Sequence, residues 1–133
     1  MRTNQDKPPL PGSIWLPISV TILGMSKPTG LVQGTLDLLI LKILALEPMH
    51  GWAIGERMKQ MSKDVLRVGP GSLYPALHKL EQTGWIKAEW SVNEEGRRVK
   101  FYSITREGHK RLRQEASDWR RLSSAITSIV FES

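Results

Sequence analysis

The stretch that decides the fold is SLYPALHKLEQTGWIKAEWSVNEEGRRVKFYSITREG, residues 72–108. Its first part carries apolar residues three and four positions apart, which is the period of an amphipathic helix. After Gly84 the period changes to two, and a polar turn at residues 93–96 separates two alternating runs. These patterns predict a helix that ends near Gly84, followed by a β-hairpin with a charged tip.

Two more helices are predicted before this stretch and one after it. Residues 35–47 are an almost continuous apolar run that Pro48 ends, which is typical of a central helix. A second, amphipathic helix follows and ends near Met61. Thr105 is a good N-cap for a last helix over residues 106–130. This order predicts a mainly α fold, a winged helix-turn-helix with a β-hairpin wing and a long C-terminal helix.

The chain has 133 residues and no cysteine, so a single small core must be held together by packing, without disulfides or thiolate metal sites. Five of its eight prolines fall within the first 30 residues, a spacing that no regular helix tolerates. We therefore expect residues 1–30 to be a Pro-rich, disordered extension and residues 31–105 to be the winged helix-turn-helix domain. Residues 106–133 are expected to be a dimerisation helix.

Residues 14–23 are apolar and follow basic residues, as in a signal peptide, but Pro17 interrupts them and no small-residue cleavage site follows. No run of eighteen or more apolar residues offers a membrane span. The sequence therefore predicts a cytoplasmic protein without a membrane partner. A further hypothesis is that the native protein begins at Met25 and lacks residues 1–24, which mass spectrometry of its N-terminus would test.

Positive charge gathers near the C-terminus. The formal net charge is +6, and residues 97–133 hold nine basic against four acidic side chains. A basic surplus of this kind favours a polyanionic partner, nucleic acid before membrane, although a solvated basic surface gives the same composition.

The third helix, predicted to start at Gly71 and Ser72 with Pro75 in its first turn, has a polar side. On a helical wheel its core face consists of Leu73, Ala76, Leu77 and Leu80. The candidate DNA-binding residues lie opposite or beside that face: Ser72, Tyr74, Pro75, His78, Lys79 and Gln82. Hydroxyl and ammonium groups can bind phosphate oxygens, whereas His and Gln can hydrogen-bond base edges. The alternative is that this side is only the solvated face of an amphipathic helix.

The hairpin adds three cations, Arg97, Arg98 and Lys100, which leave the tip together and are predicted to contact DNA phosphates. The alternative is a basic edge strand that prevents aggregation.

Of the five tryptophans, three are expected to pack inside the domain: Trp52, Trp85 and Trp90.

The last helix carries an apolar stripe with steps of three and four, made by Leu112, Ala116, Trp119, Leu122, Ile126, Ile129 and Val130. A helix of this length has no surface of its own chain to cover the stripe, so a second copy is the expected cover and the chain is predicted to be a homodimer. Trp119 is expected to fill the dimer core. The alternative is that two Trp119 side chains wall a gap for a small, flat aromatic effector.

Three segments carry a family resemblance: GTLDLLILKILALEPMHGWAIGERM at 34–58, GPGSLYPALHKLEQTGWI at 69–86 and GRRVKFYSITREG at 96–108. Together they resemble the PadR family of bacterial transcriptional regulators. The resemblance implies a dimeric winged-helix repressor of a palindromic promoter site, with DNA contacts at Ser72, Tyr74, Pro75, His78 and Lys79. It also implies dimerisation through a single helix after the wing and, in some members, sensing of small aromatic molecules. Trp52 departs from the family, where a tyrosine often follows His-Gly.

An enzymatic function is not expected. His50, His78 and His109 lie on three different predicted elements and have no metal-ligand spacing, so neither a metal nor another cofactor is predicted. The competing hypothesis for function is a winged-helix protein-interaction module without specific DNA binding. An apolar third-helix face would favour that module, but the predicted face is polar.

Overall fold

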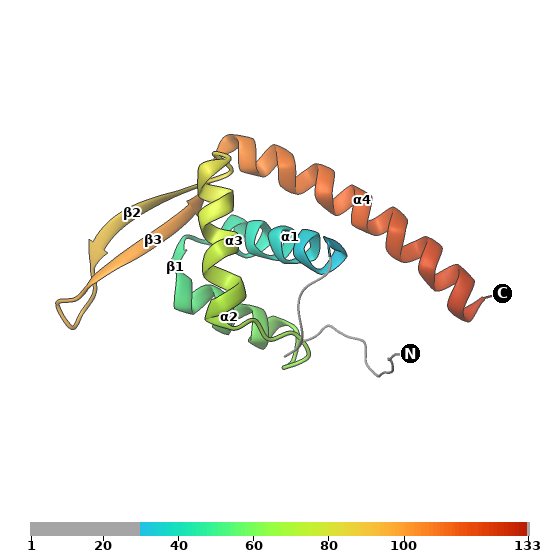
Figure 1. The fold of residues 1–133 in the computed structure, drawn as a ribbon, viewed down its shortest axis with the longest axis horizontal. Helices are drawn as coiled ribbons and strands as arrows, with labels where there is room; N and C mark the ends of the chain where they lie inside the picture. Colours follow the sequence, from blue (N-terminus) through green and yellow to red (C-terminus); the bar gives the residue numbers. More distant parts are fainter. Residues whose placement is uncertain (1–29, 133) are drawn as a thin grey trace.

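A computed structural model describes residues 30–132 of the chain. The expectations for the Pro-rich extension and for a start at Met25 lie outside these residues. The elements follow in the order α1 (Gly30–Leu46), β1 (Met49–His50), α2 (Gly51–Met61), α3 (Pro70–Gln82), β2 (Ile86–Val92), β3 (Arg98–Ile104) and α4 (Arg106–Phe131) (Figure 1). The predicted fold class, a mainly helical winged helix-turn-helix with a long C-terminal helix, is confirmed.

The sheet has one strand more than the sequence predicts. Its order is β1-β3-β2, with all neighbours antiparallel. Tyr102 of β3 lies between Met49 of β1 and Ala88 of β2. A strand of two residues is too short to show any period, which is why β1 could not be recognised in the sequence.

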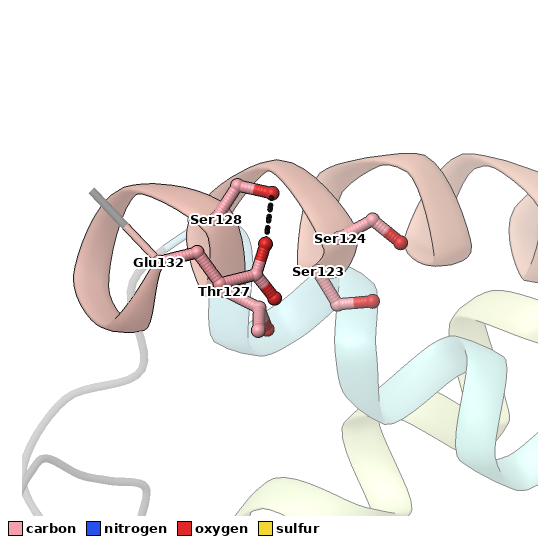
Figure 2. A pocket seen from close by; sticks show the side chains of 5 residues that line it. All are labelled: Ser123, Ser124, Thr127, Ser128 and Glu132. Atoms are coloured by element: carbon pink, nitrogen blue, oxygen red, sulfur yellow. Dashed lines mark hydrogen bonds between the residues drawn. The ribbon is translucent and has the colours of Figure 1, made fainter.

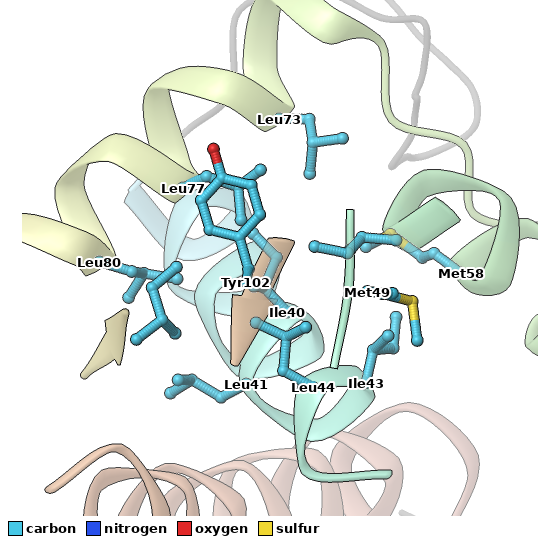
Figure 3. Packing of buried hydrophobic residues seen from close by; sticks show 12 residues of the cluster. Ile40, Leu41, Ile43, Leu44, Met49, Met58, Leu73, Leu77, Leu80 and Tyr102 are labelled. Carbon is cyan, nitrogen blue, oxygen red and sulfur yellow. The ribbon is translucent and has the colours of Figure 1, made fainter. Parts of the chain in front are cut away.

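The core lies between α1, α2, α3 and the sheet. Figure 3 shows the ring of Tyr102 standing among the leucines of the cluster, with its hydroxyl turned away from Leu41 and Leu44. The predicted core face of α3 is confirmed, since Leu73, Leu77 and Leu80 expose 3% or less and Ala76 packs against the cluster. Because this face is fixed inside, the opposite side of α3 must face outward.

Helix α3 starts earlier than the sequence predicts. Gly69 is its N-cap and Pro70 its first residue, a position that proline favours. Pro75 therefore lies in the second turn, and the prediction of a first-turn position was wrong. It has no N–H to donate to the carbonyl one turn earlier. The predicted stop is confirmed: the helix ends at Gln82, and Gly84 follows with φ +83°.

Two tryptophans lie on the surface, and the prediction that they pack inside the domain was wrong. Trp52 is 67% exposed and Trp90 is 59% exposed, whereas Trp85 packs against the core as predicted. The Trp52 ring stacks on His50 with 6.3 Å between centroids, and His50 also meets Phe101 edge to face. Trp52 thus has an aromatic partner at the surface, whereas the contacts of the Trp90 ring are with Arg98 and Lys100. Residue type alone does not reveal either contact.

The junction between the wing and α4 is hydrogen-bonded and closely packed. Thr105 is the N-cap of α4, as predicted, and its hydroxyl accepts a hydrogen bond from the Gly108 N–H at 3.0 Å. The same hydroxyl donates to the carbonyl of Gly84 at 2.7 Å. A Cβ at Gly108 would overlap the carbonyl oxygen of Trp85. The first turn of α4 therefore sits directly on the end of the α3–β2 connection.

Helix α4 is long, and among the described residues only its start packs against the core of the domain. Its 26 residues span about 39 Å at 1.5 Å per residue. Near its start Leu112 packs against the core cluster, and α4 also contacts α1. Farther along, α4 extends beyond the first turn of α1 and ends away from the domain (Figure 1).

Candidate nucleic-acid interface

The polar side of α3 is an outward face, as expected. Ser72 is half-buried, and the other five predicted residues of this face are exposed: Tyr74, Pro75, His78, Lys79 and Gln82. One helix thus brings together two hydroxyls, an imidazole, an ammonium and an amide. Such a set can hydrogen-bond both phosphates and base edges.

The tyrosine of this face rests on the first residue of α2. A methyl group placed on Gly51 would lie 2.7 Å from Cε1 of Tyr74 and 3.0 Å from its hydroxyl oxygen. Only glycine leaves room for the ring in its present position. The contact joins positions 23 residues apart in the chain, so no local sequence pattern pointed to it.

Lys79 points toward α1. Its Nζ donates to the Asp37 carboxylate at 2.6 Å, and the Asp37 side chain is only 14% exposed. A phosphate oxygen must therefore compete with an existing carboxylate for this ammonium. The sequence indicated the cation of this pair but not its partner.

The tip of the wing is a tight turn held by one asparagine. Asn93 Oδ1 accepts from the Glu95 N–H at 3.0 Å and from the Arg97 N–H at 2.9 Å, while Gly96 takes φ +81°. Arg97 belongs to this turn, and Arg98 begins β3. Both arginines are exposed, and within residues 30–132 neither forms an ion pair with a carboxylate.

Lys100 connects the wing to α3. Its Nζ lies 3.3 Å from Oε1 of Glu81 and 5.9 Å from the ring centroids of both Trp90 and Tyr102. The Arg98 guanidinium carbon stands 4.6 Å from the Trp90 centroid. Glu81 and Trp90 were not among the predicted site residues, because their role depends on a pairing between α3 and the hairpin.

One group near this surface has a shifted acidity. Burial raises the pKa of the Tyr102 phenol, and the nearby Lys100 ammonium opposes that shift. The phenol therefore stays protonated at neutral pH. Tyr102 belongs to the core and supports the interface from beneath.

The apolar stripe of α4 divides into two parts. Leu112 is half-buried against its own domain. The remaining predicted dimerisation residues, Ala116, Trp119, Leu122, Ile126 and Val130, are exposed. Three of them, Trp119, Leu122 and Ile126, expose 40–44% of their surface although they are large and apolar.

A shallow hollow lies on the C-terminal half of α4. Figure 2 shows the side chains that line it, with a hydrogen bond of 3.3 Å between Ser128 and Glu132. The lining consists of Ser123, Ser124, Thr127, Ser128 and Glu132. Trp119 does not line this hollow.

Two negative findings apply to the described part of the chain. Residues 30–132 contain no cluster of three or more His, Asp or Glu side chains able to hold a metal ion. No helix within them is long and apolar enough to cross a membrane.

The chain resembles known regulators in both sequence and structure. The model of the PadR-like family of transcriptional regulators matches residues 40–114, from within α1 to the early turns of α4. A transcriptional regulator of Clostridium thermocellum has 25% identity and a TM-score of 0.70, over 77% of this chain and 99% of its own. A PadR-like transcription factor of Bacteroides fragilis has 28% identity and a TM-score of 0.62, over 74% and 92%.

A curated relative is the uncharacterized 37.1 kDa protein of transposon TN4556 of Streptomyces fradiae, which is 40% identical over 90 residues. The match covers 68% of this chain but only 24% of that longer protein. Because the family match spans more than half of the chain and includes α3 and the wing, the chain belongs to the PadR-like family of transcriptional regulators.

Proposed function

We propose that the chain is a repressor that binds an inverted-repeat operator as a homodimer. The observation that carries the proposal is the exposed polar face of α3 together with two exposed arginines of the wing, which have no carboxylate partner in the described chain. A groove-sized helix flanked by basic side chains fits a DNA duplex better than an apolar protein partner. Membership of a family of transcriptional regulators supports the same reading.

In the proposed complex each copy inserts α3 into a major groove, and the two grooves lie about one helical turn apart. Base choice rests on His78 with Tyr74 or Gln82, while Ser72 and Pro75 approach the backbone. Four cations of α3 and the wing bind phosphates, and Arg97 and Arg98 contribute more than Lys79 and Lys100, because both lysines already face carboxylates. Residues 31–105 form the DNA-binding unit in this proposal.

The second copy covers the exposed stripe of α4, so residues 106–133 act as the dimerisation helix. A helix about 39 Å long whose apolar side chains recur every three to four residues suits packing against a twin. Trp119 lies in the middle of this stripe and is proposed to fill the interface. A small aromatic effector held between two Trp119 rings is the second candidate, favoured only by the exposure of that ring.

The test is a gel shift of the purified chain on the DNA upstream of its own gene, at a series of salt concentrations. We expect binding that falls steeply with salt. Arg98→Ala should flatten the log–log slope by about two for a dimer, because each copy loses one phosphate contact. Lys79→Ala is the matched control and should flatten the slope less, since its ammonium is held by Asp37.

Two outcomes would contradict the proposal. An unchanged slope for Arg98→Ala would show that Arg98 does not touch the backbone. If the chain does not retain its upstream DNA at any salt concentration, the winged-helix protein-interaction module becomes the better account.

A further inference from the structure

We propose that Trp90 is a positioning residue of the DNA interface: its ring holds the Arg98 guanidinium on the wing in the orientation in which it meets a phosphate. The inference rests on the proposed function and extends it to a residue that carries no charge.

The exposure of Trp90 is the first observation. This tryptophan is 59% exposed and is absent from the core cluster, so burial does not explain it. Its ring instead carries the Arg98 guanidinium carbon at 4.6 Å from the centroid, within the range of a cation–π contact.

The register of the hairpin explains how the two side chains meet. Trp90 pairs with Lys100 and Val92 pairs with Arg98, so Arg98 is the diagonal neighbour of Trp90 on the same face of the wing. Side chains in diagonal positions are within reach of an aromatic ring. The contact thus follows from the strand pairing.

Lys100 links this contact to α3. Its Nζ lies 5.9 Å from the Trp90 centroid and 3.3 Å from the Glu81 carboxylate. Lys100 therefore contacts both α3, through Glu81, and the Trp90 ring. Arg98 contacts the same ring. Two cations share one ring, and only Lys100 has a carboxylate partner in the described chain. The charge left over on Arg98 fits a polyanion such as a phosphodiester backbone.

Removing a positioning ring and removing a charge should affect DNA binding differently. A free arginine side chain loses rotamer freedom when it binds a phosphate, whereas one already ordered on a ring loses less. Removing the ring should therefore lower the affinity for DNA. It should leave the salt slope unchanged, because the number of phosphate-neutralising cations is the same.

The experiment measures DNA affinity across a salt series for the full chain and three variants: Trp90→Ala, Arg98→Ala and the double variant. We expect Trp90→Ala to bind about tenfold more weakly per dimer, roughly threefold for each copy, with the slope of the wild type. Arg98→Ala should flatten the slope by about two. The double variant should bind like Arg98→Ala alone, because the ring then has no Arg98 guanidinium to position and Lys100 is still held by Glu81.

Two further variants separate positioning from a loss of structure. Trp90→Phe keeps an aromatic face and should recover most of the affinity. Trp52→Ala removes another exposed tryptophan, which contacts His50 and not the wing arginine, and should bind like the wild type. Thermal unfolding of the variants confirms that each is folded.

A measurement without DNA tests the contact itself. In the free protein, the ring current of Trp90 should shift the NMR signals of the Arg98 side-chain protons upfield, and Trp90→Ala should abolish the shift. The inference is overturned if the shift is absent or if Trp90→Ala binds DNA as tightly as the wild type. It is also overturned if the loss of DNA affinity in the double variant equals the product of the losses in Trp90→Ala and Arg98→Ala. In the last two cases the wild type still binds DNA and the proposed function stands. A wild type that fails to bind DNA overturns both.

Discussion

Helices α3 and α4 are both amphipathic, but the apolar face of α3 is buried whereas most of the apolar face of α4 is exposed. In α3 the leucines of that face are almost completely buried among α1, α2 and the sheet, and the polar side is left outside. In α4 the large apolar residues after Leu112 remain exposed. The surface that α3 offers to a partner is therefore polar, whereas the surface that α4 offers is apolar. These two surfaces fit the two partners proposed above, a polyanion and a second copy of the chain.

The strongest test of this difference is a cavity in the α3 core face. Leu77 is fully buried, and Leu77→Ala should lower the free energy of unfolding by about 2–5 kcal/mol. Urea denaturation at a low and a high protein concentration should give the same loss, because the site is covered by its own chain. Ile129→Ala on α4, where the side chain is 71% exposed, is the contrast: any loss of stability there should appear only at the protein concentration at which the proposed dimer forms. A loss at Leu77 that depends on protein concentration would contradict the comparison.

The next test removes the centre of the α4 stripe. Trp119→Ala should weaken the dimer at least roughly thirtyfold, because a large aromatic ring at the centre of an interface is a typical hot spot. Sedimentation over a dilution series measures the change. Trp90→Ala, which truncates a tryptophan on the wing, is the control and should leave the dimer intact. If Trp119→Ala also leaves it intact but abolishes the response to an aromatic ligand, Trp119 walls an effector site instead.

The sequence predicted those features that depend on neighbouring residues. The boundary of α3 at Gly84, the hairpin and the Thr105 cap each follow from residues within a few positions of one another. The polar face of α3 was predictable for the same reason, because a helical wheel needs only the period of the helix. The exposed stripe of α4 also follows from its spacing.

What could not be predicted depends on contacts between distant positions. The Lys79–Asp37 pair joins residues 42 apart, and the Lys100–Glu81 pair joins residues 19 apart. No local pattern shows that Lys79 and Lys100, two of the residues predicted to contact phosphates, already form ion pairs with carboxylates. The surface position of Trp90 is of the same kind, since it depends on the hairpin register that places Arg98 on its ring.

A smaller effect is expected where α2 supports the polar face of α3. In Gly51→Ala the new methyl group displaces the end of the Tyr74 ring, which can move because it is the tip of a side chain. The free energy of unfolding should change by no more than about 1 kcal/mol, since alanine also favours the helix. DNA affinity should fall roughly tenfold per dimer, as for the loss of one polar contact in each copy.

Gly55→Ala is the matched control for this prediction. It lies on the same helix, and its methyl group would meet no atom closer than 3.7 Å. It should therefore bind DNA like the wild type. Equal affinity for Gly51→Ala and the wild type would show that the position of the Tyr74 ring does not matter for binding.

The smallest effect is expected at Tyr102, beneath both the wing and α3. Burial raises its pKa above the ordinary 10.0, so the unfolded chain loses this proton at lower pH than the folded one. The stabilisation from the protonated phenol is complete below about pH 10 and is lost as the pH rises through the folded pKa. Tyr102→Phe has no such proton, so its stability should fall less steeply above pH 10 in urea titrations, while near neutral pH it should match the wild type within about 1 kcal/mol. If the free energy of unfolding of Tyr102→Phe falls equally steeply above pH 10, another group is responsible for the alkaline loss of stability. The ionisation of Tyr102 beneath α3 would then not affect the stability of the core.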